Sequence, residues 1–476
     1  MSTTKAKVPM YIGTDGRELR RVLASSYVGS MIEYYDFVLY AAASGLIFNR
    51  LFFNDLPPAI ATIAAFATLA VGFVVRPLGA IIFGYFGDRV GRKSVLVLTM
   101  SMMGIATALM AVLPTRDQAG VLAPILLIVL RIVQGVSVGG EWGGAALMAF
   151  EHANPQRRGF AAVFATAGQP TGSLLAGVVL ALFALMPEDQ FLGWGWRVPF
   201  ALSAVLVVFG LWIRIRVSES PLFVEEKRRR ETTTEKVRAP LIEVLRRPGI
   251  LILAFVALLA PFLSFTLSGA FGITYGATHG LTTSSVLFIS SAGSLVCIVG
   301  ELFFAALSDR VGRRPVMIGG VIAGAVLAWP FFALLQTGTA WGALLAFALI
   351  NGVAIGATFG PLAAFMGERF HTGSRFTGLS LGYQIAATIG GGFGPLILTA
   401  LIAGNPSDVS PIVWFIAGVA VLSIVALLLS KERAVEAPVS VGVSGTTTEE
   451  TPAQVADVAT ARHAGAAEPV PGEAAR

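Results

Sequence analysis

The sequence predicts an all-α integral membrane protein in which twelve transmembrane helices form two pseudo-symmetric six-helix bundles. Of its 476 residues, 55% are hydrophobic and 13% are charged, about half the charged share of a soluble domain. Apolar runs of about 20 residues, long enough to cross a bilayer, recur along the chain. The basic residues cluster between these runs, so the net charge of +6 indicates orientation in a lipid bilayer and not nucleic-acid binding.

Two duplicated motifs divide the chain into halves. Gly84–Lys93 reads GYFGDRVGRK and Ala305–Arg314 reads AALSDRVGRR, and each ends a long apolar run. Their aspartates are 221 residues apart. Gln134–Glu151 aligns with Asn351–Glu368 without a gap, at an offset of 217 residues. Two motifs at nearly the same offset indicate a duplicated unit much longer than a solenoid repeat.

The apolar runs predict the position of each span. The first bundle, 23–216, has predicted spans at 23–48, 58–87, 95–114, 121–150, 160–187 and 196–216, and the second, 249–430, at 249–278, 283–308, 315–336, 340–370, 375–403 and 410–430. Residues 1–22 are polar and do not form a cleavable signal. A charged linker covers 217–248. Residues 431–476, rich in Ala, Pro, Thr and Glu, are predicted to be disordered.

The basic residues predict the orientation. If the chain starts inside, 29 of the 34 Lys and Arg residues lie in cytoplasmic segments and three in outer loops. Such an asymmetry predicts that both termini lie in the cytoplasm. The expected location is the inner or plasma membrane, which the chain crosses several times.

The twelve spans, with GxxxDRxGRK after the second, resemble the major facilitator superfamily. IEYYDF at 32–37, RPLG at 76–79 and RIVQGVSVGGEWGGA at 131–145 are similar to its metabolite:proton symporter branch. FLGWGWRVPF at 191–200 and GYQIAATIGGGFGP at 382–395 look like the shikimate permeases of that branch. The resemblance covers residues 20–430, with Ala305 as a departure where the first copy has Gly84. It implies the major facilitator fold and transport of a metabolite such as shikimate, 2-oxoglutarate, citrate, proline or betaine.

The repeated motif predicts a gate at the cytoplasmic helix ends. Asp88 lies at a span end within reach of a neighbouring helix N-terminus, whose dipole stabilises a carboxylate. Gly84 and Gly91 permit close backbone approach and a tight turn. The resemblance implies that this network latches the outward-facing state, and the alternative is a loop that only sets topology. The predicted gate consists of Gly84, Asp88, Arg89, Gly91, Arg92, Lys93, Asp309, Arg310, Arg313 and Arg314, with Glu151 and Arg158 and their repeats Glu368 and Arg375.

Charged residues inside the spans predict a transport pathway, because at bilayer depth each costs several kcal/mol unless paired or hydrated. Glu33 and Asp36 share one face of the first span, and Arg131 and Glu141 share one stripe of the fourth. The second half has Ala348 and Thr358 at the positions of Arg131 and Glu141. We therefore expect proton coupling in the first half.

In the coupling hypothesis, Asp36 or Glu33 pairs with Arg131 when deprotonated, and protonation frees the arginine for an anionic substrate. Related proton-coupled sugar porters look similar, with an acid in the first span and a base in the fourth. The alternative is a static ion-pair network that fixes helix packing. The predicted proton-coupling residues are Glu33, Asp36, Arg131, Glu141 and Glu301, and for Glu301 a packing role is the alternative.

Arg76 is the predicted anchor for a substrate carboxylate. It lies 12 residues before Asp88, about 18 Å along a helix, and a guanidinium fork matches a carboxylate in two bonds. The alternative is an ion pair with Asp36 or Glu33. The other predicted substrate contacts, each of which could equally make an interhelical hydrogen bond, are Tyr34, Gln134, Gln169, Asn351, Tyr383 and Gln384.

These features predict a monomeric secondary transporter, not an enzyme, that imports a small carboxylated metabolite with protons by alternating access. No GxxxxGK[ST] loop supports ATP drive. Cys297 is the single cysteine and the four histidines have no ligand spacing, so neither a metal nor a cofactor is expected. The rivals are a proline or betaine importer, a proton-driven xenobiotic exporter and a non-transporting sensor. The tail after Ser430 has no apolar heptads, which disfavours an osmosensing importer with a coiled coil, and two buried arginines disfavour the exporter.

Overall fold

The computed structural model describes residues 16–430 apart from 184, 221–222, 226, 229–239, 372, 403–404 and 406. Most of the predicted first tail (1–15), the middle of the linker and the predicted disordered tail (431–476) lie outside the described residues. Across the described residues the secondary structure is entirely helical, which confirms the predicted fold class.

The first half contains α1 to α11. Its long helices are α1 (Gly16–Ala43), α3 (Pro58–Val74), α4 (Arg76–Gly87), α5 (Arg92–Ala111), α7 (Leu122–His152), α9 (Phe164–Phe183) and α11 (Arg197–Ile215). Short turns join or extend them: η1 (Ser44–Phe48), α2 (Asn49–Leu51), α6 (Arg116–Ala119), η2 (Pro155–Arg157), α8 (Arg158–Ala162), α10 (Glu188–Gln190) and η3 (Phe191–Gly195).

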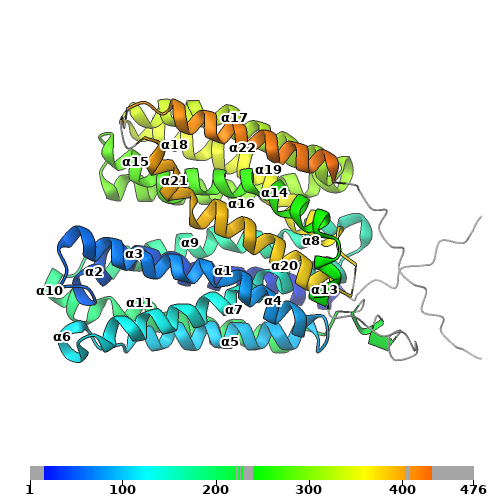
Figure 1. The fold of residues 1–476 in the computed structure, drawn as a ribbon, viewed down its shortest axis with the longest axis horizontal. Helices are drawn as coiled ribbons and strands as arrows, with labels where there is room; N and C mark the ends of the chain where they lie inside the picture. The colour runs from blue at the N-terminus through cyan, green and yellow to red at the C-terminus, as the bar shows by residue number, and fades with distance from the viewer. Residues whose placement is uncertain are drawn as a thin grey trace, which may run out of the picture. The chain divides into compact units, whose positions relative to one another are not determined.

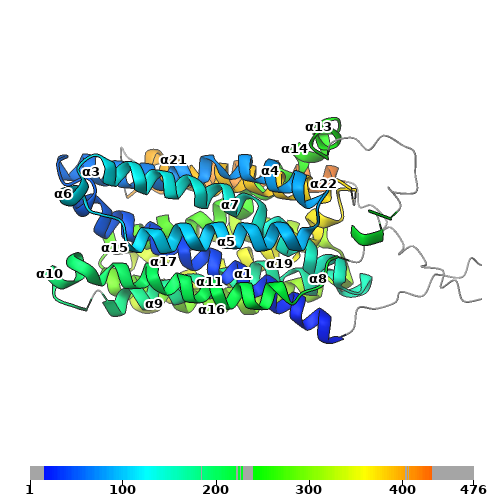
Figure 2. The same cartoon turned by 90° about the horizontal axis from the view of Figure 1, so that it is seen from below.

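The second half begins with the short α13 (Pro240–Leu245) and contains α14 (Pro248–Thr266), α15 (Gly272–Thr278), α16 (Thr283–Val311), α17 (Arg313–Gln336), α18 (Ala340–Leu349), α19 (Gly356–Gly367), α20 (Arg375–Ala386), α21 (Gly394–Leu401) and α22 (Ser410–Leu429). Single π-helical turns interrupt three of its spans: η4 (Leu267–Phe271), η5 (Ile350–Ile355) and η6 (Ala387–Gly392). Figure 1 shows α1–α11 in blue through cyan to blue-green and α14–α22 in green to orange, with most of the long helices roughly parallel or antiparallel to one another. Figure 2 shows the same arrangement from below.

Eleven helical segments of the described residues are long and apolar enough to cross a membrane. They coincide with the second to twelfth predicted spans. The first predicted span corresponds to α1 and η1, and α1 falls short of this criterion because it carries charged residues, among them Glu33 and Asp36. The apolar runs of the sequence therefore predicted the positions of these helices. They also predicted α1, whose charged residues make it less apolar than the others.

Glycines bring α4 and α7 into backbone contact beside the predicted site. A Cβ added at Gly79 would lie 1.9 Å from the Val136 carbonyl oxygen, and one at Gly139 would lie 2.2 Å from that of Arg76. Pro77 at the start of α4 marks the break between α3 and α4, since proline cannot donate to the preceding turn. These contacts hold Arg76 against α7, the helix that carries Arg131.

The two halves meet along α4 and α7 against α20, and along α8 and α9 against α16 and α19. On the first of these surfaces, a Cβ at Gly84 would lie 2.7 Å from Thr377 Cα and one at Gly87 would lie 1.9 Å from the Phe376 ring. Both positions are near the end of α4 that precedes Asp88. We call the end of the helical bundles that contains Asp88 and Asp309 the motif end. Small residues are thus required for the halves to close there.

Gly84→Leu is expected to force α4 and α20 apart, because the added side chain meets the backbone of Thr377. Overpacking of this kind costs about 1–3 kcal/mol, so the melting temperature should fall and the distance between spin labels on the motif ends of α4 and α20 should lengthen. Gly177→Leu is the control, since nothing lies within 4 Å of its added Cβ. Equal label distances in both variants would contradict the close contact.

Candidate functional site

Six charged side chains that fall within the predicted spans of the first half are buried, each at most 7% exposed. We call this set the charge cluster: Glu33, Asp36, Arg76, Arg131, Glu141 and Arg214. It contains three acids and three arginines and is therefore neutral when all six are ionised. Burial of the five predicted members agrees with the expectation that they face the protein interior and not lipid.

Asp36 is held by neutral donors and not by an ion pair. Its Oδ1 accepts from the Ser203 hydroxyl of α11 at 2.5 Å, and its Oδ2 accepts from the Thr107 hydroxyl of α5 at 2.7 Å. Gln134 Nε2 donates to Thr107 at 2.7 Å, and Arg131 Nη1 donates to Gln134 Oε1 at 3.0 Å. The expected direct pair between Asp36 and Arg131 is thus corrected to a hydrogen-bond chain, in which Gln134 is a link and not a free substrate contact.

Arg131 packs on an aromatic ring instead. Its guanidinium carbon lies 4.2 Å from the centre of the Tyr40 ring, and its Nε and Nη2 have no hydrogen-bond partner. The Tyr40 hydroxyl is fixed by Thr68 of α3 at 2.7 Å. A cation–π contact of this kind stabilises a desolvated guanidinium by about 2 kcal/mol, so Arg131 keeps its charge without a direct acid partner.

Arg76 makes no hydrogen bond or ion pair with the described residues. Its guanidinium carbon lies 4.1 Å from the centre of the Phe73 ring and 5.5 Å from that of Phe37, and its buried Nε has no partner. Glu33 is the nearby acid whose charge interacts with it, but Glu33 Oε2 also has no partner. The predicted alternative, an ion pair of Arg76 with Glu33 or Asp36, is therefore not found in this state.

Glu141 forms the one direct ion pair within the charge cluster, with Arg214 of α11 at 2.6 Å. Arg214 is one of the 29 basic residues assigned above to cytoplasmic segments, although it falls inside the predicted sixth span. Gly29 of α1 makes room for it, since a Cβ there would lie 2.2 Å from Arg214 Nη2. Glu141 is thus placed as a partner of Arg214, which sequence reasoning missed.

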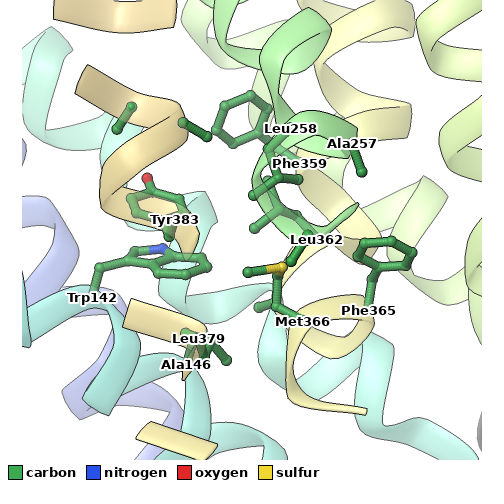
Figure 3. Packing of buried hydrophobic residues seen from close by; sticks show 14 of the residues in the cluster. Trp142, Ala146, Ala257, Leu258, Phe359, Leu362, Phe365, Met366, Leu379 and Tyr383 are labelled. Carbon is green, nitrogen blue, oxygen red and sulfur yellow. The ribbon is translucent and has the colours of Figure 1, made fainter. Parts of the chain in front are cut away.

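Three predicted substrate contacts converge on one hydroxyl group between the halves. Gln169 Nε2 of α9 donates to the Tyr383 hydroxyl at 3.3 Å, and the Tyr34 hydroxyl is a further hydrogen-bond partner of that group. The Tyr383 ring stacks on Trp142 of α7, with ring centres 3.6 Å apart (Figure 3). Trp142 is fully buried and its indole N–H has no partner. Sequence reasoning missed Trp142, although it lies in the quoted EWGG string.

The remaining candidates lie apart from this hydroxyl group. Gln384 Nε2 donates to the Val138 carbonyl across the halves at 3.2 Å. Asn351 in η5 accepts from the Ser268 hydroxyl in η4 at 2.8 Å. Glu301 of α16 is buried and accepts from Cys297 Sγ at 3.6 Å. Within the described residues, no group of three or more His, Cys, Asp or Glu side chains could hold a metal ion.

Each repeated aspartate caps a helix of the opposite half. Asp88 accepts from the backbone N–H groups of Phe376 and Thr377 at 3.2 and 3.0 Å and from the Thr377 hydroxyl at 2.9 Å. Asp309 accepts from the backbone N–H groups of Gly159 and Phe160, both at 2.9 Å. We call these two contacts the latch. Burial raises the pKa of Asp88 to about 6, while the Arg92 charge and the donors on Thr377 and Phe376 act in the opposite direction, so the carboxylate is mostly ionised at pH 7.

A second layer of ion pairs surrounds the latch. Glu151 pairs with Arg92 at 2.5 Å and, across the halves, with Arg375 at 3.2 Å. Arg313 pairs with Asp309 at 2.6 Å and with Glu368 at 3.3 Å. Ser220 of the linker also donates to Glu151, and Glu219 accepts from the backbone N–H of Arg92 at 3.1 Å and of Lys93 at 3.2 Å. Sequence reasoning missed both linker residues.

The other predicted gate residues have separate positions. Gly91 and Gly312 have φ angles of 128° and 97°, which glycine adopts readily in the turns after each motif. Arg314 donates to the carbonyls of Leu427 and Leu428 at the end of α22. Arg158 lies over the Phe150 ring at 4.7 Å. Arg89 and Arg310 are exposed and take no part in the latch.

Comparisons with known proteins agree with this geometry. The family model of sugar (and other) transporters matches residues 22–245, and that of the Major Facilitator Superfamily matches residues 253–461. The shikimate transporter of Escherichia coli is 40% identical over 87% of this chain and 95% of its own. The inner membrane metabolite transport protein YhjE of the same organism is 36% identical over 87% of this chain and 94% of its own, and its proline/betaine transporter is 29% identical over 88% and 85%.

A solved structure has the same fold. The proton:xylose symporter XylE, bound to 6-bromo-6-deoxy-D-glucose, superposes with a TM-score of 0.70 at 17% sequence identity, over 89% of this chain and 99% of that one. Transporter sequences and this fold thus match the chain along nearly its whole helical part. The chain belongs to the major facilitator superfamily, a family of membrane transporters and not of enzymes.

Proposed function

We propose that this transporter imports a small carboxylated metabolite, shikimate-like, aromatic or dicarboxylic, by symport with protons. The observation that carries the proposal is the buried Arg76 guanidinium, which rests on two aromatic rings and has no hydrogen-bond or ion-pair partner among the described residues. A desolvated cation of this kind is costly. A substrate carboxylate would supply the missing partner in a bidentate contact.

Charge balance links the anion to a proton. The charge cluster is neutral with all six groups ionised, so binding of a carboxylate alone would leave one net negative charge in a desolvated site. Protonation of one acid together with binding of one monocarboxylate restores neutrality. Since an uncompensated buried charge costs several kcal/mol, the two ligands are expected to bind together.

Asp36 and Glu33 are the acids best placed to take that proton. Glu33 shares a charge interaction with Arg76, and Asp36 is connected to Arg131 through Gln134 and Thr107. Neutralising either acid leaves the arginines with excess positive charge for the substrate. Glu301, on the facing α16, is proposed as a second protonation site.

The ring of the substrate would meet aromatic side chains between the halves. The stacked Trp142 and Tyr383 come from α7 and α20, in opposite halves of the chain. The unpartnered Trp142 N–H can donate to a ring hydroxyl or a carboxylate. A donor of this kind favours a substrate that carries hydroxyl groups, such as the shikimate named for one relative, over a substrate without them.

Alternating access follows from the latch. We place the motif end in the cytoplasm because 29 of 34 basic residues lie on that side. There the two aspartates tie the halves together, and Gly84 and Gly87 allow close approach. Opening toward the cytoplasm would break these contacts and separate Trp142 from Tyr383.

Uptake into proteoliposomes tests the function directly. The purified protein should accumulate radiolabelled shikimate when the outside is made acidic, and collapse of the proton gradient by an ionophore should abolish accumulation. Hydroxybenzoates, 2-oxoglutarate, citrate and betaine are compared as competitors. Competition by betaine alone would make the protein an osmolyte importer, and no uptake of any compound would contradict transport of these acids.

Asp36→Asn is expected to uncouple the transporter. The amide keeps a hydrogen-bonding group between Ser203 and Thr107 but cannot take up a proton, so proton-driven accumulation should fall by about a hundredfold or more. Exchange of internal for external substrate should continue. The measurement is uphill uptake beside counterflow in the same liposomes, and unimpaired uphill uptake would rule out Asp36 as the coupling acid.

Arg76→Lys is expected to weaken substrate binding while the fold is kept, because an ammonium cannot make the bidentate contact. The Kd from a thermal-shift titration with shikimate should rise about tenfold, or about 1.4 kcal/mol. Arg50→Lys is the control, since Arg50 pairs with Glu188 on the exposed outer surface. An unchanged Kd in Arg76→Lys would place the carboxylate elsewhere.

A further inference from the structure

The buried Glu141–Arg214 pair is the part of the charge cluster that adjoins a small cavity at the motif end. The cavity is small, about 10 Å³, with room for about one water molecule. Its lining includes Ser25, Ser26, Lys93 and Arg214. Lys93 is half-buried at the first turn of α5, so the cavity extends from the buried ion pair to the motif end of the bundle.

One face of α1 connects this cavity to the predicted proton acceptors. Ser25, Ser26, Gly29, Glu33 and Asp36 recur at helical spacing and are all buried. A Cβ at Gly29 would touch both Arg214 and Glu141, at 2.2 and 3.3 Å. Glu33 is one turn further along the same face, about 6 Å away. The charges that act on Glu33 include those of Glu141 and Arg214.

Both members of the ion pair have a buried polar atom without a hydrogen-bond partner. Glu141 Oε2 has no hydrogen-bond partner, and neither do Glu33 Oε2 and Arg214 Nη2. The Ser26 hydroxyl, which lines the cavity, donates to the Ala145 carbonyl one turn beyond Glu141 at 2.9 Å. A purely structural ion pair would satisfy its buried atoms. These unsatisfied atoms, together with the adjoining cavity, suit a group that exchanges a proton.

We propose that protons leave the charge cluster through the interior of the first bundle, from Glu33 to Glu141 and then to water in the cavity, without passage through the latch. The Glu33 carboxylic acid gives its proton to the Glu141 carboxylate. Neutral Glu141 releases its hold on Arg214, and the cavity water takes the proton as hydronium and carries it past Lys93. Arg214 stays protonated throughout and restores the ion pair once Glu141 is ionised again.

The groups around Glu141 are consistent with transfer through it. Arg214 of α11 pairs with Glu141, and the Glu141 charge acts on Glu33 and Asp36 of α1. Lys93 of α5 lines the adjoining cavity. The Arg214 charge, 2.6 Å from Glu141, favours the ionised carboxylate. Glu141 is therefore suited to pass the proton on to the cavity water.

The double variant E141Q/R214Q tests the route, and the inference rests on the proposed proton symport. Two glutamines keep a neutral hydrogen bond in place of the ion pair, a change that folded proteins often tolerate. In proteoliposomes with an internal pH dye, shikimate-driven proton entry should fall about tenfold or more, while shikimate counterflow should stay within about twofold. The control, D55N/R116Q, replaces an exposed outer pair and should change neither rate.

Ser25→Cys provides a second measurement in a protein of nearly unchanged shape. A small thiosulfonate added on the motif-end side should label the cysteine, fill the cavity and slow proton entry but not counterflow. Labelling of the parent protein, whose one cysteine is buried, should have no effect. Proton entry that survives both E141Q/R214Q and Ser25 labelling overturns the route. A parent protein without shikimate-driven proton entry overturns the proposed symport itself.

Discussion

The structure depends on holding three acidic and three basic side chains together inside one bundle. An uncompensated charge at bilayer depth costs several kcal/mol, yet only Glu141 and Arg214 form a direct ion pair within this group. The other two arginines lie against aromatic rings, Arg131 on Tyr40 and Arg76 on Phe73. The acids and arginines of the cluster balance in number, and Arg76 and Arg131 have no direct acid partner in the described part of the chain. If each arginine were paired with one acid, none of them would be available to a ligand.

The latch is present in both halves and the charge cluster in one. Both aspartates bind backbone N–H groups, which any sequence supplies once a helix starts at that place, so the contact survives divergence of the two copies. At the position of Glu141, the second half has Thr358, whose hydroxyl donates to the Ala354 carbonyl of its own helix at 2.8 Å. The duplicated contacts join the two bundles, and the proposed proton coupling lies in the part that has no counterpart in the second half.

The spans and the repeat could be predicted because hydropathy and motif spacing are local properties of the sequence, and so could a helix N-terminus near Asp88, although not which helix supplies it. The burial of Arg214 could not, since a charge near a span end is indistinguishable from a cytoplasmic one until α11 packs against Gly29. Helical periodicity also predicted that Asp36 and Arg131 face the interior, but it gives no distance between helices. Two uncharged side chains, Thr107 and Gln134, fill that distance and turned the expected ion pair into a hydrogen-bond chain.

This chain offers a physical means of sensing a proton. The Thr107 hydroxyl has one hydrogen and two acceptors within reach, Asp36 Oδ2 at 2.7 Å and the Met103 carbonyl at 2.9 Å. When Asp36 is ionised, the hydroxyl donates to the carboxylate, because a charged acceptor forms the stronger bond. If a protonated Asp36 carries its hydrogen on Oδ2, it donates to Thr107, which then turns its own hydrogen to Met103 and accepts from both Asp36 and Gln134. The negative charge near Arg131 is then removed, while the hydrogen bonds that join α1, α5 and α7 are kept. Arg131 can therefore attract an anion without movement of these helices.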